Sequence, residues 1–148
     1  MGMSTFTGPI TAGDVLDTTG STVGTLKNVG YVEMAQTYAV NQTTTETATA
    51  TTIVIPANSL IVSIDLITTV AWSSATTTYT ISVGTSATAT ELVSATNANS
   101  VSKISLVPAT LAQSTLWLNT GTSDIQVYVK SGAHSVTNGL GTLVVRYI

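Results

Sequence analysis

The stretch from Leu60 to Trp72 limits the possible folds of this chain more than any other, because its residues alternate in character at every second position. One row of alternate positions is almost entirely apolar and consists of Leu60, Val62, Ile64, Leu66, Thr68, Val70 and Trp72. The other row is mixed and consists of Ile61, Ser63, Asp65, Ile67, Thr69 and Ala71. A period of two is the signature of a β-strand with one buried and one wet face. The stretch therefore predicts a core strand of a β-sandwich or barrel.

Shorter alternating segments, separated by turn residues, surround this strand. Further strands are predicted at 31–40, 52–55, 77–83, 103–107, 116–118, 125–130 and 141–148. The turn Pro56-Ala57-Asn58-Ser59 is expected to join 52–55 and the central strand as a hairpin. The polar stretch 41–52 suits either an edge strand or a loop, and 85–102 is expected to be a long connection with at most one helical turn. About eight short strands favour an all-β, antiparallel β-sandwich that is jelly-roll-like.

The N-terminal segment differs from the rest of the chain. We predict an extended N-terminal arm at 1–28 and a single β-sandwich domain at 29–148, since 148 residues suit one domain with a real core. The first segment is rich in glycine, threonine and aspartate, and its apolar residues stand singly. It is either an ordinary frayed terminus or an arm that lies along a neighbouring subunit. The second interpretation makes these residues candidates for subunit contact: Phe6, Ile10, Val15 and Leu16.

Charge is scarce throughout the chain. Charged residues are 7% of the total, against roughly 25% in ordinary soluble domains. A neutral surface rich in threonine hydroxyls has little like-charge repulsion, which suits a dense, permanent assembly. The four basic residues are widely separated and the net charge is −3, so nucleic-acid binding is disfavoured. The sequence shows no signal peptide and no apolar run of 18 residues, so we expect cytoplasmic synthesis and no membrane partner.

The sequence contains few groups that could support catalysis or hold a metal. Cysteine is absent, and His134 is interpreted as an exposed loop residue. Asp14 and Asp17 are too few for a calcium loop, and Asp65 is expected to be a solubilising charge on the outer row of the central strand. Spacing alone leaves a glycosidase pair open among the scattered acids Glu33, Glu46, Glu91 and Asp124. Because the composition gives such a pair no support, we expect no enzymatic activity and no cofactor.

Aromatic residues raise the possibility of carbohydrate binding, because sugar rings stack on exposed aromatic side chains. Trp72, however, ends the apolar row of the central strand, and Trp117 stands between Leu116 and Leu118. Packing in the core or at a subunit interface is therefore the favoured role for both tryptophans.

Several segments resemble those of small jelly-roll virion proteins of tailed bacteriophages, including capsid decoration (cement) proteins. The segments are IVIPANSLIVSIDLITTVAW, TYTISVGTSATATELV, DIQVYVKSG and the terminal GTLVVRYI, within 51–148. The opening FTGPITAGDVLDTTGSTVG is similar to the openings of uncharacterised marine-phage virion proteins.

This resemblance implies a non-enzymatic homotrimer in the virion, on the outer capsid surface at local three-fold positions. Its partner would be the major capsid protein, which it would clamp against internal DNA pressure, and the arm residues would then contact the capsid or another subunit. The alternative is a host-recognition or carbohydrate-binding β-sandwich module of a phage fibre or tail. Exposed aromatic residues near loop ends would favour that module, whereas flat, neutral surfaces favour a cement protein.

Overall fold

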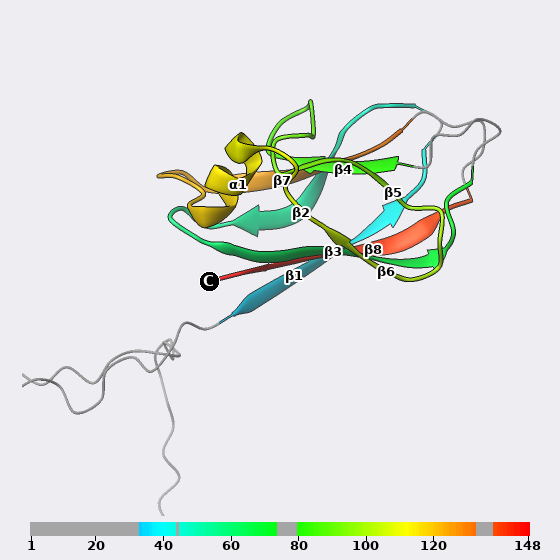
Figure 1. Cartoon of the computed structure of the whole chain (residues 1–148), viewed down its shortest axis with the longest axis horizontal. Coiled ribbons are helices and arrows are strands. Elements are labelled where there is room, and N and C mark those ends of the chain that lie inside the picture. The colour runs from blue at the N-terminus through cyan, green and yellow to red at the C-terminus, as the bar shows by residue number, and fades with distance from the viewer. Residues whose placement is uncertain (1–32, 44, 74–79, 133–137) are drawn as a thin grey trace, which may run out of the picture. The chain divides into compact units, whose positions relative to one another are not determined.

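Eight strands and one short helix make up the part of the chain that the computed structural model describes, namely residues 33–43, 45–73, 80–132 and 138–148 (Figure 1). The elements are β1 (Met34–Asn41), β2 (Thr49–Ile55), β3 (Ile61–Val70), β4 (Thr80–Gly84), β5 (Val93–Asn97), β6 (Lys103–Leu106), α1 (Leu111–Leu118), β7 (Ile125–Ser131) and β8 (Leu140–Tyr147). Met34–Ile148 forms one compact unit. The predicted arm, with Phe6, Ile10, Val15 and Leu16, lies outside the described residues.

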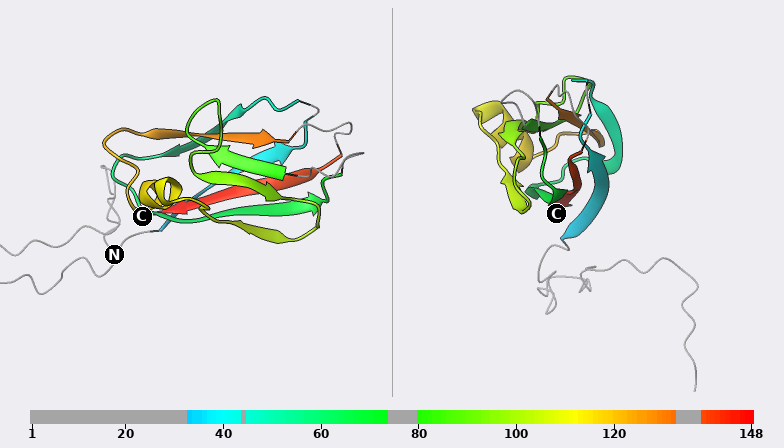
Figure 2. Two further views of the ribbon diagram at one scale, coloured as in Figure 1. Left: turned by 45° about the horizontal axis from the view of Figure 1, so that its top comes forward. Right: turned by 90° about the vertical axis from the view of Figure 1, so that its right-hand side faces the viewer.

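The strands form two antiparallel four-stranded sheets that face each other (Figure 2). One sheet has the order β1-β8-β3-β6 and the other has the order β2-β7-β4-β5. Every connection between successive strands crosses from one sheet to the other, except that β4 and β5 are neighbours in the same sheet. This is the strand order of an eight-stranded jelly roll. The predicted all-β antiparallel sandwich is therefore confirmed.

The predicted hairpin between residues 52–55 and the central strand is wrong. β2 pairs with β7, whereas β3 pairs with β6 and β8 in the opposite sheet. The turn between β2 and β3 is attached to the segment before β7: the Ala57 amide donates to Asp124 Oδ1 at 3.0 Å, and the Asn58 amide donates to the Gly121 carbonyl at 2.7 Å. Asn58 has a φ of 60°, which asparagine tolerates. These contacts direct the chain from one sheet to the other, and the apolar residues of both strands join the same core.

The central strand β3 follows the predicted alternation only in its middle. Ile64, Leu66 and Thr68 are buried as expected, but Val62 and Val70 are 43% and 40% exposed. The register of β3 against β8 shifts at both ends of the strand, between Ile61 and Ser63 and between Thr68 and Val70. Such a bulge adds a residue to one strand and reverses which side chains face inward beyond it. Ile61 is accordingly buried, although the sequence places it on the outer row.

Two other expectations of secondary structure are also wrong. Residues 85–102, predicted to be a connection, contain strand β5, and the strand predicted at 116–118 is part of helix α1. The helix begins with a capping box, in which the Thr110 side chain accepts from the Gln113 amide and the Gln113 side chain accepts from the Thr110 amide. A threonine followed three residues later by glutamine is a sequence signal for a helix start, so this helix could have been recognised from the sequence.

The core lies between the sheets and is formed almost entirely by aliphatic side chains with one tryptophan. Its largest fully buried members include Trp72, Ile53, Ile55, Ile64, Leu66, Ile81, Leu92, Leu106 and Leu143. Val127 and Val129 of β7 and Val145 of β8 complete the facing rows. Among the described residues, no helix has the length and apolar character needed to cross a bilayer.

Glutamine side chains connect the strands and loops of this charge-poor protein. Gln36 of β1 bridges to β2, because its Nε2 donates to the Val54 carbonyl at 2.6 Å and its Oε1 accepts from the Val54 amide at 3.1 Å. Buried Gln42 joins two further segments: its Nε2 donates to the Ser73 carbonyl at 2.5 Å, and its Oε1 accepts from the Gly139 amide at 3.0 Å. Neutral amides satisfy buried backbone groups without the desolvation cost of a charge.

Candidate functional site

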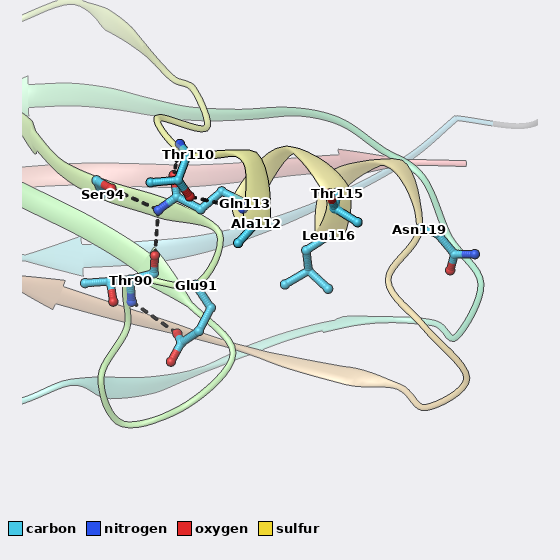
Figure 3. Close-up of a pocket in the computed structure, with 9 residues that line it drawn as sticks. All are labelled: Thr90, Glu91, Ser94, Thr110, Ala112, Gln113, Thr115, Leu116 and Asn119. Atoms are coloured by element: carbon cyan, nitrogen blue, oxygen red, sulfur yellow. Dashed lines mark hydrogen bonds between the residues drawn. The ribbon is translucent and has the colours of Figure 1, made fainter.

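Helix α1 lies at one end of the sandwich (Figure 2). A groove lies beside this helix. Its volume is about 530 Å³. One wall is the helix and the other is the segment that leads into β5 (Figure 3). The lining residues are Thr90, Glu91, Ser94, Thr110, Ala112, Gln113, Thr115, Leu116 and Asn119. The groove is therefore lined by hydroxyl, amide and aliphatic groups with one carboxylate.

Gln113 joins the two walls of the groove, as the dashed lines in Figure 3 show. Its Nε2 donates to the Thr90 carbonyl at 2.7 Å and to Ser94 Oγ at 2.9 Å. Its Oε1 accepts from the amides of Ala109 and Thr110 at 2.6 and 3.1 Å. Gln113 is 4% exposed, so these four hydrogen bonds satisfy a buried amide on both of its polar atoms. The side chain thus holds the start of α1 against the β4–β5 connection.

The Glu91 carboxylate folds back onto its own loop. Its Oε2 accepts from the amides of Thr85 and Thr90 at 3.0 and 3.1 Å, and its Oε1 accepts from the hydroxyls of Ser86 and Thr88. Burial raises the pKa of Glu91, but these hydrogen bonds outweigh it and lower the pKa from 4.5 to about 2. A carboxylate with so low a pKa is ionised at neutral pH and is unsuited to act as a general acid.

A glycine is required beneath this carboxylate. A Cβ atom on Gly84 would lie 1.9 Å from Glu91 Oε2 and 2.6 Å from the Thr90 nitrogen. The loop 85–92 therefore closes on the end of β4 only because position 84 has no side chain. This arrangement makes Glu91 a structural anchor of the groove wall.

Large apolar side chains project from α1 and from the residues just before it. Leu111 and Leu118 are 84% and 70% exposed, and Val107, just before the helix, is 62% exposed. The helix instead buries the polar Gln113, while Leu116 and Trp117 are partly buried against the core. Sequence analysis missed this surface because the segment was interpreted as a strand. Once the capping box places a helix at 111–118, the seven-residue spacing of the two leucines puts them on one side.

A second neutral surface is the outer face of the β1-β8-β3-β6 sheet. Its positions alternate with the buried core residues and, by register, include Ala35, Thr37, Ala39, Ser63, Asp65, Ile67, Lys103, Ser105, Thr142, Val144 and Arg146. Ile67 is 43% exposed, and the alanines and Thr37 on β1 are exposed as well. Small and aliphatic residues thus dominate a broad sheet face that contains three charged positions.

Asp65, which the sequence analysis placed in solvent, is in fact buried on this face. It is 3% exposed and forms an ion pair with Lys103, whose Nζ lies 3.2 Å from Asp65 Oδ2. The hydroxyls of Ser105 and Ser63 donate to its Oδ1 and Oδ2 at 3.0 and 3.2 Å. The prediction failed because it considered a single strand, whereas Ser105 and Lys103 reach Asp65 from the neighbouring strand β6.

Other acidic groups do not gather in one place in the described part of the chain. Asp124 accepts from the Ala57 amide, and no group of three or more His, Cys, Asp or Glu residues is arranged to hold a metal ion among the described residues. His134, Asp14 and Asp17 lie outside those residues. Of the four acids considered for a glycosidase pair, only Glu91 lines the groove.

Both tryptophans pack inward, as the sequence analysis favoured. Trp72 is 1% exposed within the core, and Trp117 is partly buried with its Nε1 donating to the Leu92 carbonyl at 3.0 Å. Neither indole ring is thus presented as a fully exposed platform for a sugar ring.

Comparison with known proteins finds one informative likeness in fold. No protein-family model matches the chain, and no curated protein sequence matches it. Among solved structures, the chain is similar to a chain of the cyanophage Pam1 capsid asymmetric unit, with 19% sequence identity and a TM-score of 0.59. The match covers 96% of this chain and 98% of that chain. At this level of identity the match shows a shared fold.

Proposed function

We propose that this protein is a structural component of a phage virion. The observation that carries the proposal is the agreement in fold, along nearly the whole chain, with a chain from a cyanophage capsid asymmetric unit. Jelly rolls also occur in lectins and enzymes of the cupin class, so the fold by itself permits several functions. The sequence resemblance to virion proteins of tailed phages supports the same choice.

Within the virion, we propose the role of a capsid decoration (cement) protein that binds the outer surface of the major capsid lattice as a homotrimer. One feature of the fold supports this role. The outer face of the β1-β8-β3-β6 sheet is broad and poor in charge, and its one acid, Asp65, is already paired with Lys103. A symmetric trimer on a symmetric lattice would engage several such surfaces at once, which raises the overall affinity of contacts that are individually weak.

The same features support a protein without enzymatic activity. Glu91, the one carboxylate in the α1 groove, has both oxygens engaged by its own loop. The alternative of a host-recognition or carbohydrate-binding module of a fibre or tail draws less support, since Trp72 and Trp117 are both turned toward the core. The experiment below distinguishes the two roles by position on the particle.

The proposal is tested by locating the protein on virus particles from the source of this sequence. An antibody against the purified chain, detected by gold in electron microscopy, is expected to label heads over their whole surface. Labelling confined to tails or fibres would support the alternative role, and intact particles without label would overturn the virion assignment. Particles stripped of the protein and then mixed with purified chain provide the matched test of rebinding.

Rebinding also has an expected dependence on salt. Contacts between neutral surfaces depend little on screening, whereas attraction between charged surfaces weakens as ionic strength rises. Occupancy of stripped heads should therefore change little between low and high salt. A strong loss at high salt would point to a charged contact elsewhere on the protein.

A further inference from the structure

We infer that the exposed face of α1 and the groove beside it form a contact between two copies of this chain. The choice of a second copy as the occupant rests on the proposed structural role, in which copies assemble symmetrically. The contact can be tested on the purified protein, without virus particles. We define the α1 contact surface as Val107, Leu111 and Leu118 together with the residues that line the groove.

The projecting part of this surface consists of two leucines. Leu111 and Leu118 are seven residues apart, which is about two turns of helix, so they lie on one side roughly 10 Å apart. Their exposed fractions of 84% and 70% are the largest among the large hydrophobic residues of the described chain. Covering both side chains would remove apolar surface from water, which favours a partner on this side of the helix.

The receiving part of the surface is the groove itself. Ala112, Thr115 and Leu116 line it from the helix, and Asn119 lines it from the helix C-cap. Thr115 shares the side of the helix that carries Leu111 and Leu118, whereas Ala112 and Leu116 each follow a residue of that side and lie about 100° further around the helix. The opposite wall is formed by Thr90, Glu91 and Ser94, which belong to the segment that leads into β5 and to β5 itself. A volume of about 530 Å³ is in the range that accepts a small molecule or several aliphatic groups.

The groove presents no unpaired charge to an entering leucine. Glu91 has its oxygens occupied by Thr85, Ser86, Thr88 and Thr90, and Gln113 has both polar atoms bonded to neighbours. An aliphatic side chain that enters the groove therefore leaves the hydrogen bonds of Glu91 and Gln113 in place. Gln113 also fixes the position of the helix before binding, so the loss of conformational entropy on association is small.

A projecting row and a groove on the same surface are what a contact between identical copies requires. In a cyclic trimer, the leucines of each copy enter the groove of the next copy, so that every copy contributes both parts of the surface. Charge places few obstacles in the way of this occupant. Residues 104–123 contain no charged side chain, although each copy has a net charge of −3. The one charged residue that lines the groove is Glu91, and its own loop binds both oxygens of its carboxylate.

The first experiment measures self-association of the full-length protein by sedimentation velocity. The double variant Leu111→Gln/Leu118→Gln is expected to weaken association at least tenfold, with an unchanged far-UV spectrum because both side chains are exposed. Val101→Gln is the matched control, since Val101 is 64% exposed but lies in the β5–β6 connection, at the other end of β6 from Val107. Equal weakening by the control, or no weakening by the double variant, would overturn the inference.

The second experiment uses the natural absence of cysteine. Leu118→Cys and Thr90→Cys variants, carrying different tags, are mixed and oxidised gently. A leucine that enters a neighbouring groove predicts a disulfide-linked pair of the two chains. The mixture of Val101→Cys with Thr90→Cys should yield far less. Similar yields from both mixtures would exclude this contact.

These outcomes separate the inference from the proposed function. A chain that labels and rebinds heads but shows no α1 contact would retain its virion role and lose this interface. A chain that associates through α1 but is absent from particles would keep the interface and lose the virion role.

Discussion

At the scale of single residues, Glu91 shows how this protein uses one of its few charges. The carboxylate accepts hydrogen bonds from Thr85, Ser86, Thr88 and Thr90 and sits against Gly84, where a Cβ atom would not fit. Hydrogen bonds to the ionised form stabilise it and lower its pKa. The consequence is a contribution to folding that depends on pH.

We predict that Glu91→Gln lowers the free energy of unfolding at pH 7 by about 1–3 kcal/mol, since hydrogen bonds to a charged acceptor are stronger than those to a neutral one. Because the folded pKa, about 2, is below the ordinary value of 4.5, the contribution is present above pH 4.5 and is lost as pH falls toward 2. Urea unfolding of both proteins across this range should show their stabilities converging. A difference that persists unchanged at pH 2 would contradict the assignment.

The two isoleucines of β3 give a second residue-scale prediction. Ile64 is 1% exposed, whereas Ile67, three residues later, is 43% exposed on the outer sheet face. Ile64→Ala should lower the free energy of unfolding by about 2–5 kcal/mol, because it leaves a cavity in the core. Ile67→Ala should cost less than about 1 kcal/mol, as is usual for surface substitutions. Ile64→Asp should prevent folding, because it would bury an unpaired carboxylate.

Equilibrium denaturation of the two alanine variants provides the measurement. Comparable losses from both would show that the assigned faces of β3 are wrong in the middle of the strand. The comparison is informative because the residue type and the substitution are identical and only the burial differs.

At the scale of elements, helix α1 is attached through the buried Gln113 and the partly buried Leu116 and Trp117, while two of its leucines stay exposed. Its buried residue is Gln113, and its exposed residues include Leu111 and Leu118. Isolated helices of eight residues are unstable in water, so this helix depends on its attachments. Gln113 and the indole of Trp117, which donates to the Leu92 carbonyl, supply them from the two ends.

We predict that Gln113→Ala lowers the free energy of unfolding by about 1–3 kcal/mol, because it removes a buried side chain that hydrogen-bonds to the Thr90 carbonyl and to the Ala109 amide. Amide exchange within 109–119 should accelerate more than exchange within β3 and β8. Ser114→Ala, on the same helix, removes only a hydroxyl that donates to the Thr110 carbonyl and should have a small effect. Unchanged exchange in α1 would show that Gln113 does not hold the helix.

At the scale of the whole molecule, Met34–Ile148 forms a compact unit that contains both sheets and the core. We predict that deletion of residues 1–24 leaves the β-sandwich folded, because every strand of the described chain lies beyond the deleted segment. If Phe6, Ile10, Val15 and Leu16 contact the capsid or another subunit, as the sequence analysis proposed, the same deletion should reduce occupancy of stripped heads severalfold.

Circular dichroism and thermal unfolding measure the first part of this prediction, and rebinding to stripped heads measures the second. If the truncated protein occupies stripped heads as fully as the full-length protein and keeps its oligomeric state, the segment is an ordinary terminus with no role in contact. Loss of folding would show instead that the sandwich requires residues before Met34.

The sequence by itself was enough to determine the class of the fold. The strict alternation around Ile64 and Leu66 depends only on the period of a strand, and that period is a local property of the backbone. Scarcity of charge and the inward packing of Trp72 could also be inferred, since both follow from composition and from position within an apolar row. Even α1 had a local signal in Thr110 and Gln113.

Only the tertiary structure decided the features that depend on which segments become neighbours. The bulges that turn Val62 and Val70 outward are set by the register of β3 against β8, and no single strand encodes that register. Asp65 is buried because β6 brings Lys103 and Ser105 beside it, about 40 residues along the chain. The α1 groove likewise exists because Gln113 reaches Thr90 and Ser94. Pairing between distant segments is settled by the packing of the whole core, so contacts of this kind appear only once the sandwich has closed.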